Sequence, residues 1–278
     1  MEITIGISFY NAECYLEYAI LSVINQTLKD WRLILLDDGS TDGSLSIAKS
    51  FNDDRIEVYS DGINRGLVAR LNQLTSMVQS PYYARMDADD IMHPNRLEQQ
   101  LGFLKSHPDI DVVGSSVYFI TNNNTVYSRK DYKKNPCEDD VYSDACFAHP
   151  SVTGKTSWFK ANTYDNKAVR MEDFDLWLRT INKSNFANIN TPLLFYRDSG
   201  TPHLKKYLLS QKNGIKVLLK HNKYLYILKS IFKCLIYLFV YTFKIEGFLF
   251  KIKHIKLDEI ECDKAKEDLC KAIINRML

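Results

Sequence analysis

The sequence predicts an α/β protein with a Rossmann-like, doubly wound and mostly parallel sheet. Through the first 120 residues, short β-branched and apolar runs alternate with segments whose apolar residues recur at helical spacing. Polar and acidic motifs follow several of the apolar runs. Because ligands of such sheets bind beyond the carboxyl ends of the strands, these motifs mark the expected site.

The predicted strands of this first part are short and apolar. They lie at residues 3–9, 31–36, 56–59, 82–86 and 112–120. Helices are predicted between them, at 13–26, 44–51, 67–78 and after Pro94. In the first of these helices, apolar residues return every three or four positions, as on one buried face. The alternation predicts parallel strands with helices on both faces of the sheet.

The second part is less regular. Residues 121–140 are rich in Asn, Lys and Asp and are expected to form a surface excursion. We expect a helix at 171–181, a strand at 189–196 and a helix at 202–220. These elements divide the chain into a main domain, 1–200, and a helical C-terminal extension, 201–278.

Composition excludes several classes of protein. The 278 residues include 36 basic and 34 acidic ones, so nothing indicates a nucleic-acid binder. Six scattered cysteines lack zinc-ligand spacing, which predicts reduced thiols and a cytoplasmic protein. We recognise no signal peptide, and no uncharged apolar stretch is long enough for a spanning helix.

Two acidic motifs follow predicted strands. Residues 37–42 read Asp-Asp-Gly-Ser-Thr-Asp, and residues 87–90 read Asp-Ala-Asp-Asp. Three carboxylates in the second motif repel one another unless a cation lies between them, and oxygen ligands suit Mg²⁺ or Mn²⁺. The alternatives are a strand-to-helix turn, with Ser40 or Asp42 as the N-cap, and a solvated acidic turn.

With four further motifs, these residues resemble the inverting glycosyltransferases of family 2, which have the GT-A fold. The further motifs are Ser8-Phe9-Tyr10-Asn11, Asn64-Arg65-Gly66, His149-Pro150-Ser151 and the run Glu-Asp-Phe-Asp-Leu-Trp-Leu-Arg at 172–179. The resemblance implies that 1–200 binds a nucleotide sugar and transfers a hexose, from a UDP-hexose, to a glycan or lipid-linked acceptor. Assembly of bacterial lipopolysaccharide O-antigen or capsule is the implied process.

The resemblance assigns the donor side of the site. Ser8, Tyr10, Asp38 and Arg65 match positions that hold the nucleotide, with Tyr10 near the base and Asp38 accepting its imide N–H. Asp87 matches a position near the ribose or phosphates.

The resemblance also assigns a metal site. Asp89 matches the ligand of Mn²⁺ or Mg²⁺. Many members carry Tyr-Arg-x-His after the last core strand, but here Asp198 and Ser199 follow Tyr196 and Arg197. His203 is a candidate substitute for that histidine, with a solvent-facing histidine as the alternative, and Arg197 is a candidate phosphate contact.

An inverting transfer needs a carboxylate that accepts the proton of the acceptor hydroxyl. Asp173 matches the family's base, while Glu172 and Asp175 compete with it, and a partner for the helix dipole is the alternative role. His149 matches the acceptor-side wall. Trp177, one turn after Asp173, either belongs to the core or lines the acceptor sugar site.

Residues 224–253 are apolar and aromatic but contain lysines. On a helix, Lys229, Lys233, Lys244 and Lys251 would fall within roughly 60° of one another. This pattern predicts an in-plane helix on an anionic membrane, peripheral to the inner face of the cytoplasmic membrane. The alternative is an ordinary helix pair packed on the domain. An exposed closing helix is expected after Lys256.

Two other functions compete with sugar transfer. A sugar nucleotidyltransferase would normally carry a glycine-rich phosphate loop with a basic residue near the N-terminus, and residues 5–10 are not one. A non-catalytic partner subunit that binds nucleotide sugars is disfavoured because Asp38, Asp89 and Asp173 are all present.

Overall fold

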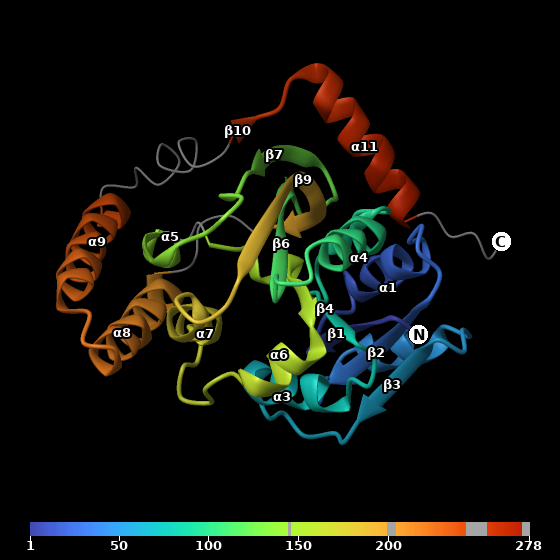
Figure 1. Ribbon diagram of the computed structural model, residues 1–278, viewed down its shortest axis with the longest axis horizontal. Helices are drawn as coiled ribbons and strands as arrows, with labels where there is room; N and C mark the ends of the chain where they lie inside the picture. The colour runs from blue at the N-terminus through green and yellow to red at the C-terminus, as the bar shows by residue number, and fades with distance from the viewer. Residues whose placement is uncertain (144–145, 199–203, 243–254, 274–278) are drawn as a thin grey trace.

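The computed structural model describes residues 1–143, 146–198, 204–242 and 255–273 (Figure 1). A single twisted sheet runs through the molecule, and helices cover both of its faces. This arrangement confirms the predicted α/β class.

The N-terminal half is a parallel sheet with the order β3-β2-β1-β4. Its strands are β1 (Ile3–Phe9), β2 (Trp31–Asp37), β3 (Ile56–Ser60) and β4 (Tyr82–Arg85). The helices between them are α1 (Leu16–Ile24), α2 (Ser44–Ser50) and α3 (Leu67–Met77). Burial of β1 and β2 on both faces accounts for their continuous apolar runs. Because the strands are parallel, the motifs that follow β1, β2 and β4 meet at one edge of the sheet.

The second half of the sheet is mixed and not mostly parallel. From β4 the order continues β8-β6-β7-β10, and these neighbours pair antiparallel, whereas β9 pairs parallel with β6. Its strands are β5 (Ile91–Met92), β6 (Val112–Ile120), β7 (Val126–Lys130), β8 (Thr153–Lys155) and β9 (Phe186–Arg197). Its helices are α4 (Arg96–Ser106), α5 (Glu138–Tyr142), η1 (His149–Ser151), α6 (Thr156–Ala161) and α7 (Glu172–Thr180).

The surface excursion predicted for residues 121–140 is partly wrong. Strand β7 lies inside it and forms a hairpin with β6, in which Ser128 pairs with Phe119. Val126 and Ser128 are buried while Tyr127 and Arg129 are partly exposed, so the strand has two unlike faces. The polar composition concealed this short alternating strand.

The C-terminal part contains two long helices and a return to the sheet. Helices α8 (Leu204–Lys220) and α9 (Tyr224–Thr242) pack on each other, with the Tyr207 and Tyr237 rings stacked at 3.8 Å. Strand β10 (Ile255–Lys256) then pairs with β7. No helix in the described part of the chain is long and apolar enough to cross a membrane.

Helix α11 (Glu259–Ile273) is not simply exposed, as was predicted for the closing helix. Its Ala265, Leu269 and Ala272 are buried, and it packs against α1 and β5 (Figure 1). Asn25 Nδ2 donates a hydrogen bond to the Ala272 carbonyl at 2.8 Å. The charged residues therefore cover only the outer face of a helix that completes the core.

Candidate active site

Asp38 organises the loop that precedes α3. Its carboxylate accepts the backbone N–H groups of Arg65, at 2.7 Å, and Gly66, at 3.0 Å. Gly66 has a φ of +85°, a conformation that side-chain-bearing residues rarely adopt. The fully buried Arg70 donates its Nε–H to Oδ1 of Asp38 at 2.9 Å. Within the described chain, Oδ2 accepts only from Gly66, which leaves it able to accept one more N–H.

The remaining donor-side residues lie at the same edge of the sheet. The Asp38 N–H donates to the Phe9 carbonyl at 2.8 Å, which brings Asp38 beside Ser8 and Tyr10. Tyr10 follows β1 and is 49% exposed. Arg65 is half-exposed and pairs with Asp61 at 2.9 Å.

The other carboxylates of the 37–42 motif are structural. Asp37 accepts hydrogen bonds from the Ser40 N–H and the Ser60 hydroxyl. Burial opposes its ionisation, but these hydrogen bonds prevail and lower the pKa of Asp37. Asp42 accepts the N–H of Ser44, the first residue of α2, at 3.0 Å, but the N-cap of α2 is Gly43, so neither Ser40 nor Asp42 takes the N-cap position considered for it.

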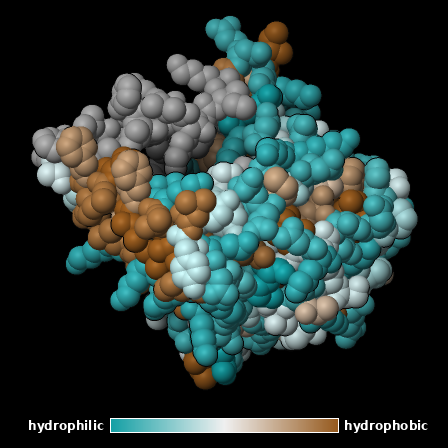
Figure 2. All heavy atoms as spheres, turned by 60° about the vertical axis from the view of Figure 1, so that its left-hand side comes forward, coloured by the Kyte–Doolittle hydropathy of each residue, from teal (hydrophilic) through white to brown (hydrophobic). Residues whose placement is uncertain are grey.

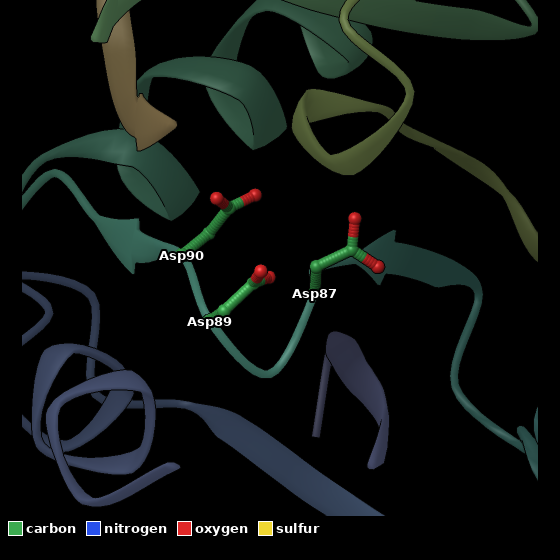
Figure 3. A group of neighbouring side chains, drawn as sticks. All are labelled: Asp87, Asp89 and Asp90. Atoms are coloured by element: carbon green, nitrogen blue, oxygen red, sulfur yellow. The ribbon is translucent and has the colours of Figure 1, made fainter. Parts of the chain in front are cut away.

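Asp87, Asp89 and Asp90 lie on the loop between β4 and β5, with their side chains on one side of it (Figure 3). One carboxylate oxygen from each lies within 4.8 Å of those of the other two. Desolvation and repulsion by Asp87 raise the pKa of Asp89 to about 6. Because the Asp89 side chain is exposed, its desolvation is small, and we attribute the raised pKa mainly to repulsion between the Asp87 and Asp89 carboxylates. A bound cation would relieve this repulsion.

Asp90 and Arg197 hold this loop in place through hydrogen bonds to each other and to the loop backbone. Asp90 is buried and accepts the Arg197 N–H at 2.8 Å, while its Oδ2 has no hydrogen-bond partner among the described residues. The Arg197 guanidinium donates to the carbonyls of Asp89 and Thr121, both at 2.7 Å, and to Asn124 Oδ1 at 2.6 Å. We therefore assign Arg197 to the support of the acidic loop and not to phosphate. His203 lies outside the described residues.

A cavity of about 880 Å³ joins the donor side to the start of α7. Arg65, Asp87, His149 and Asp173, all singled out in the sequence, line it. Ser8, Tyr10, Asp38, Asp89 and Trp177 are not part of its wall as far as the structure describes it. The cavity thus brings Arg65, which is expected to bind the nucleotide, and Asp87 of the acidic motif together with the candidate base Asp173.

Both Glu172 and Asp173 line this cavity at the N-terminus of α7. Oδ1 of Asp173 accepts the Phe174 N–H at 2.7 Å. Glu172 is 9% exposed, and burial raises the pKa of its carboxyl. Asp175 is fully buried and lies outside the wall, ion-paired to Arg179 at 2.7 Å and Lys220 at 3.1 Å. The geometry leaves Glu172 as the one serious competitor of Asp173.

His149 is a neutral member of the wall. Its Nε2 lies 2.8 Å from the Tyr164 hydroxyl, and burial lowers the pKa of the imidazole well below its usual value. Trp177 is 3% exposed in the core, where its ring meets His149 edge-on at 6.0 Å and lies nearly parallel to Trp158 at 6.1 Å. Trp177 therefore belongs to the core, in contact with His149 of the cavity wall.

Several wall residues were not singled out in the sequence, and three of them are Arg85, Lys130 and Tyr132. Arg85, with its side chain 3% exposed, donates to Asp87 Oδ1 at 2.5 Å. Lys130 and Tyr132 come from the region predicted as a surface excursion. The alternating run after the Asn-rich turn at 122–124 was the available signal for a hairpin there.

Comparison with known proteins decides the family. Residues 4–176 match the sequence model of glycosyl transferase family 2. The chain belongs to this family. It is 32% identical, over 86% of its length, to an uncharacterized glycosyltransferase of Methanocaldococcus jannaschii, of which it covers 88%. It is also 26% identical, over 73% of its length and 76% of the relative's, to the UDP-Glc:alpha-D-GlcNAc-diphosphoundecaprenol beta-1,3-glucosyltransferase WfgD of Escherichia coli.

Solved structures confirm the GT-A fold for this family 2 glycosyltransferase. S. aureus TarS 1-349 in complex with UDP-GlcNAc superposes with a TM-score of 0.66 at 16% identity, covering 99% of this chain and 82% of TarS. The mannosyltransferase PcManGT of Pyrobaculum calidifontis, in complex with GDP-Man and Mn²⁺, superposes with a TM-score of 0.58 at 15% identity. It covers 80% of this chain and 64% of PcManGT. At these identities the likeness concerns the fold alone.

Proposed function

We propose that this glycosyltransferase moves a hexose from a UDP-hexose to a lipid-linked glycan, with inversion, in bacterial O-antigen or capsule assembly. The observation that carries the proposal is the cavity that Arg65 and Asp87 share with Glu172 and Asp173. In an inverting transfer the leaving group and the attacking hydroxyl lie on opposite sides of the anomeric carbon. In this proposal Arg65 and Asp87 face the leaving group, and Glu172 and Asp173 face the hydroxyl.

Asp38 and Tyr10 hold the uracil in this proposal. The spare accepting capacity of Asp38 Oδ2 suits the imide N–H, and the exposed Tyr10 ring offers a stacking surface beside it. The Arg65 and Gly66 amides are already engaged by Asp38, so the loop is ordered before the donor binds. WfgD, a relative that uses UDP-Glc, and TarS, which binds UDP-GlcNAc, support a uridine donor.

The acidic loop fits a divalent cation. Three carboxylates converge, burial and mutual repulsion raise the pKa of both Asp89 and Asp90, and Asp90 Oδ2 is buried without a hydrogen-bond partner in the described chain. Asp89, with Asp87 beside it, would hold Mn²⁺ or Mg²⁺, which supplies positive charge to the departing diphosphate. Arg85 keeps one oxygen of Asp87 engaged and so fixes the direction of its other oxygen.

Asp173 accepts the proton of the acceptor hydroxyl as the hydroxyl attacks the anomeric carbon. A backbone N–H already orients its carboxylate. The neutral His149, held by Tyr164, can donate or accept a hydrogen bond to the acceptor sugar without competing for the proton. The bond to the diphosphate breaks as the new glycosidic bond forms, so no covalent enzyme intermediate is required.

The enzyme works at the inner face of the cytoplasmic membrane in this proposal. Helix α9 carries large apolar side chains on its outer surface together with Lys229 and Lys233. Lys244 and Lys251, the other members of the predicted stripe, lie outside the described residues. A diphosphoundecaprenol acceptor, such as the one named for WfgD, is itself membrane-bound.

The test is a donor screen. Purified protein is incubated with Mn²⁺, a panel of nucleotide sugars and acceptors in which a sugar is linked to a short-chain polyprenyl diphosphate, and the released nucleotide is measured. We expect UDP release from one UDP-hexose that depends on the acceptor. Pyrophosphate release from UTP and a sugar phosphate would instead show a nucleotidyltransferase. Nucleotide-sugar binding without turnover for any pair would favour the partner-subunit alternative.

A further inference from the structure

The surface of the α8–α9 hairpin is apolar and positively charged at once. Figure 2 shows hydrophobic atoms gathered over these helices. Six side chains of α9 are 58–65% exposed, namely Tyr224, Leu225, Leu228, Phe232, Leu235 and Phe239. The two helices contain seven lysines and no acidic residue. The lysines are Lys205, Lys206, Lys212, Lys216, Lys220, Lys229 and Lys233.

This surface fits an anionic bilayer better than a second copy of the chain. The spacing of Leu225, Leu228, Phe232 and Leu235 would also suit a partner helix. However, Ile231, Ile236 and Leu238 are exposed as well, which makes the apolar face wider than a coiled-coil seam. Two copies would also bring like-charged lysines together, whereas anionic headgroups would neutralise them.

The same hairpin grips the α6–α7 loop, residues 162–171, which precedes the candidate base. Asn213 Nδ2 donates to the Val169 carbonyl at 3.0 Å, and Ser210 Oγ accepts the Arg170 Nε–H at 3.0 Å. Lys220 pairs with Asp165 at 2.8 Å. The buried Gly214 also faces Met171 at the end of the loop, where an added Cβ would meet Sδ at an ordinary contact distance of 3.5 Å.

The grip holds the loop in an unfavourable backbone conformation. Arg170 has a φ of +63°, which is unusual for a residue with a side chain. Such conformations persist where the surroundings enforce them. Asn166, Val169 and Arg170 of the loop line the cavity, and Glu172 and Asp173 follow directly. A shift of α8 would therefore be felt at the acceptor side of the site.

We infer that docking of the α8–α9 hairpin on an anionic bilayer fixes the α6–α7 loop and thereby the position of the base. The hairpin couples membrane binding to catalysis, which deepens the function proposed above. An enzyme that meets its acceptor only at the membrane gains by completing its acceptor side there. Ser210, Asn213 and Lys220 are positioning residues in this coupling, because they act on the base through the loop.

Hydrogen exchange of the α6–α7 loop tests the coupling without any substrate. The full chain is measured alone, with phosphatidylcholine vesicles and with vesicles that also contain phosphatidylglycerol. We expect only the anionic vesicles to bind and to slow exchange in the loop by about fivefold or more, as for a typical coupling between sites. Bound protein with unchanged loop exchange would overturn the inference, as would a protein that forms dimers and ignores anionic vesicles.

Two double variants separate binding from coupling. K229Q with K233Q removes charge from α9 but keeps its apolar contacts, so we expect weaker binding and no protection. S210A with N213A removes two bonds between α8 and the loop and leaves the cavity wall intact. We expect this variant to bind vesicles as the parent does but to show no protection, and full protection would refute the proposed route.

The exchange measurement is independent of the donor screen. A failed donor screen with loop protection by anionic vesicles would reject the proposed reaction and keep the inference. A successful screen without loop protection would keep the reaction and reject the inference. If both succeed, anionic vesicles should also raise UDP release by the parent and leave UDP release by S210A with N213A unchanged.

Discussion

Replacing Asp173 by Asn should nearly abolish transfer and leave the fold intact. The amide oxygen of Asn can still accept the Phe174 N–H that now binds Oδ1 at 2.7 Å. The change also removes a negative charge from the start of α7, where its interaction with the helix dipole is worth about 0.3–1 kcal/mol. A general base contributes about 10²–10⁴-fold, which corresponds to about 2.7–5.4 kcal/mol of transition-state stabilisation. The catalytic loss should thus exceed the structural one severalfold.

The assay is UDP release with the donor and acceptor found in the screen, beside calorimetry of UDP binding and thermal unfolding. We expect turnover to fall by about 10²-fold or more. UDP affinity should hold because the base faces the acceptor. Asp175→Asn is the matched control, since it breaks the pairs with Arg179 and Lys220. It should cost on the order of 1–3 kcal/mol of stability and affect the chemical step less.

Glu172 provides the result that would refute this reasoning. It lines the same cavity, and its raised pKa makes it a plausible proton acceptor. Near-parental turnover in Asp173→Asn together with an inactive Glu172→Gln would move the base to Glu172. Loss of UDP binding in Asp173→Asn would show that the carboxylate belongs to the donor side.

Three further outcomes are expected. Asp89→Asn should lower turnover by about 10²-fold or more because it removes the charge that holds the cation, and insensitivity to both this change and EDTA would exclude a metal-dependent mechanism. Asp38→Asn should weaken UDP binding in calorimetry because an amide N–H₂ replaces one accepting oxygen. We choose Asn over Ala because Ala would leave the buried Arg70 without its partner, and unchanged affinity would exclude the uracil contact. Glu172→Gln should raise the unfolding temperature at pH 7, since burial raises the pKa of this carboxyl in the folded state. With Glu172 protonated, the parent is as stable as the variant, and it loses free energy of unfolding as pH rises from the unfolded pKa, near 4.3, through the raised folded pKa. The difference in unfolding temperature between variant and parent should therefore vanish below about pH 4. A difference that stays constant with pH would contradict the assignment.

The first half of the fold was predictable because local pattern and tertiary structure agree there. Apolar runs such as Trp31–Asp37 are buried on both faces, and a buried strand needs no alternation to be recognised. Strand β7 was missed because the polar composition of its region concealed a short alternating run, and the inner face of α11 was missed because partners distant in sequence bury it. Nothing local in Ala265 or Leu269 shows that α1 will cover them.

The candidate site divides in the same way. Asp38, Asp87 and Asp173 stand in motifs whose order along the chain is informative by itself. Arg85 becomes notable only when the cavity shows it beside Asp87, whereas Glu172 already competed with Asp173 in the sequence. The sequence placed the acidic run at a strand end, but the division between the exposed Asp89 and the supporting Asp90 depends on Arg197, which arrives from β9. The catalytic and binding roles themselves remain predictions.

The return of α11 to α1 bears on how the protein is made and altered. During synthesis the apolar face of α1 leaves the ribosome long before α11, so the domain passes through a stage in which that face has no cover. His93, whose Nε2 lies 3.2 Å from Asp268 in the folded protein, likewise lacks this partner until α11 has been synthesised. A truncation at Tyr224, made to remove α9, would also remove this cover, and we expect it to yield an aggregating protein. Substitutions on the outer face of α9 are therefore the proper way to test the proposed membrane contact.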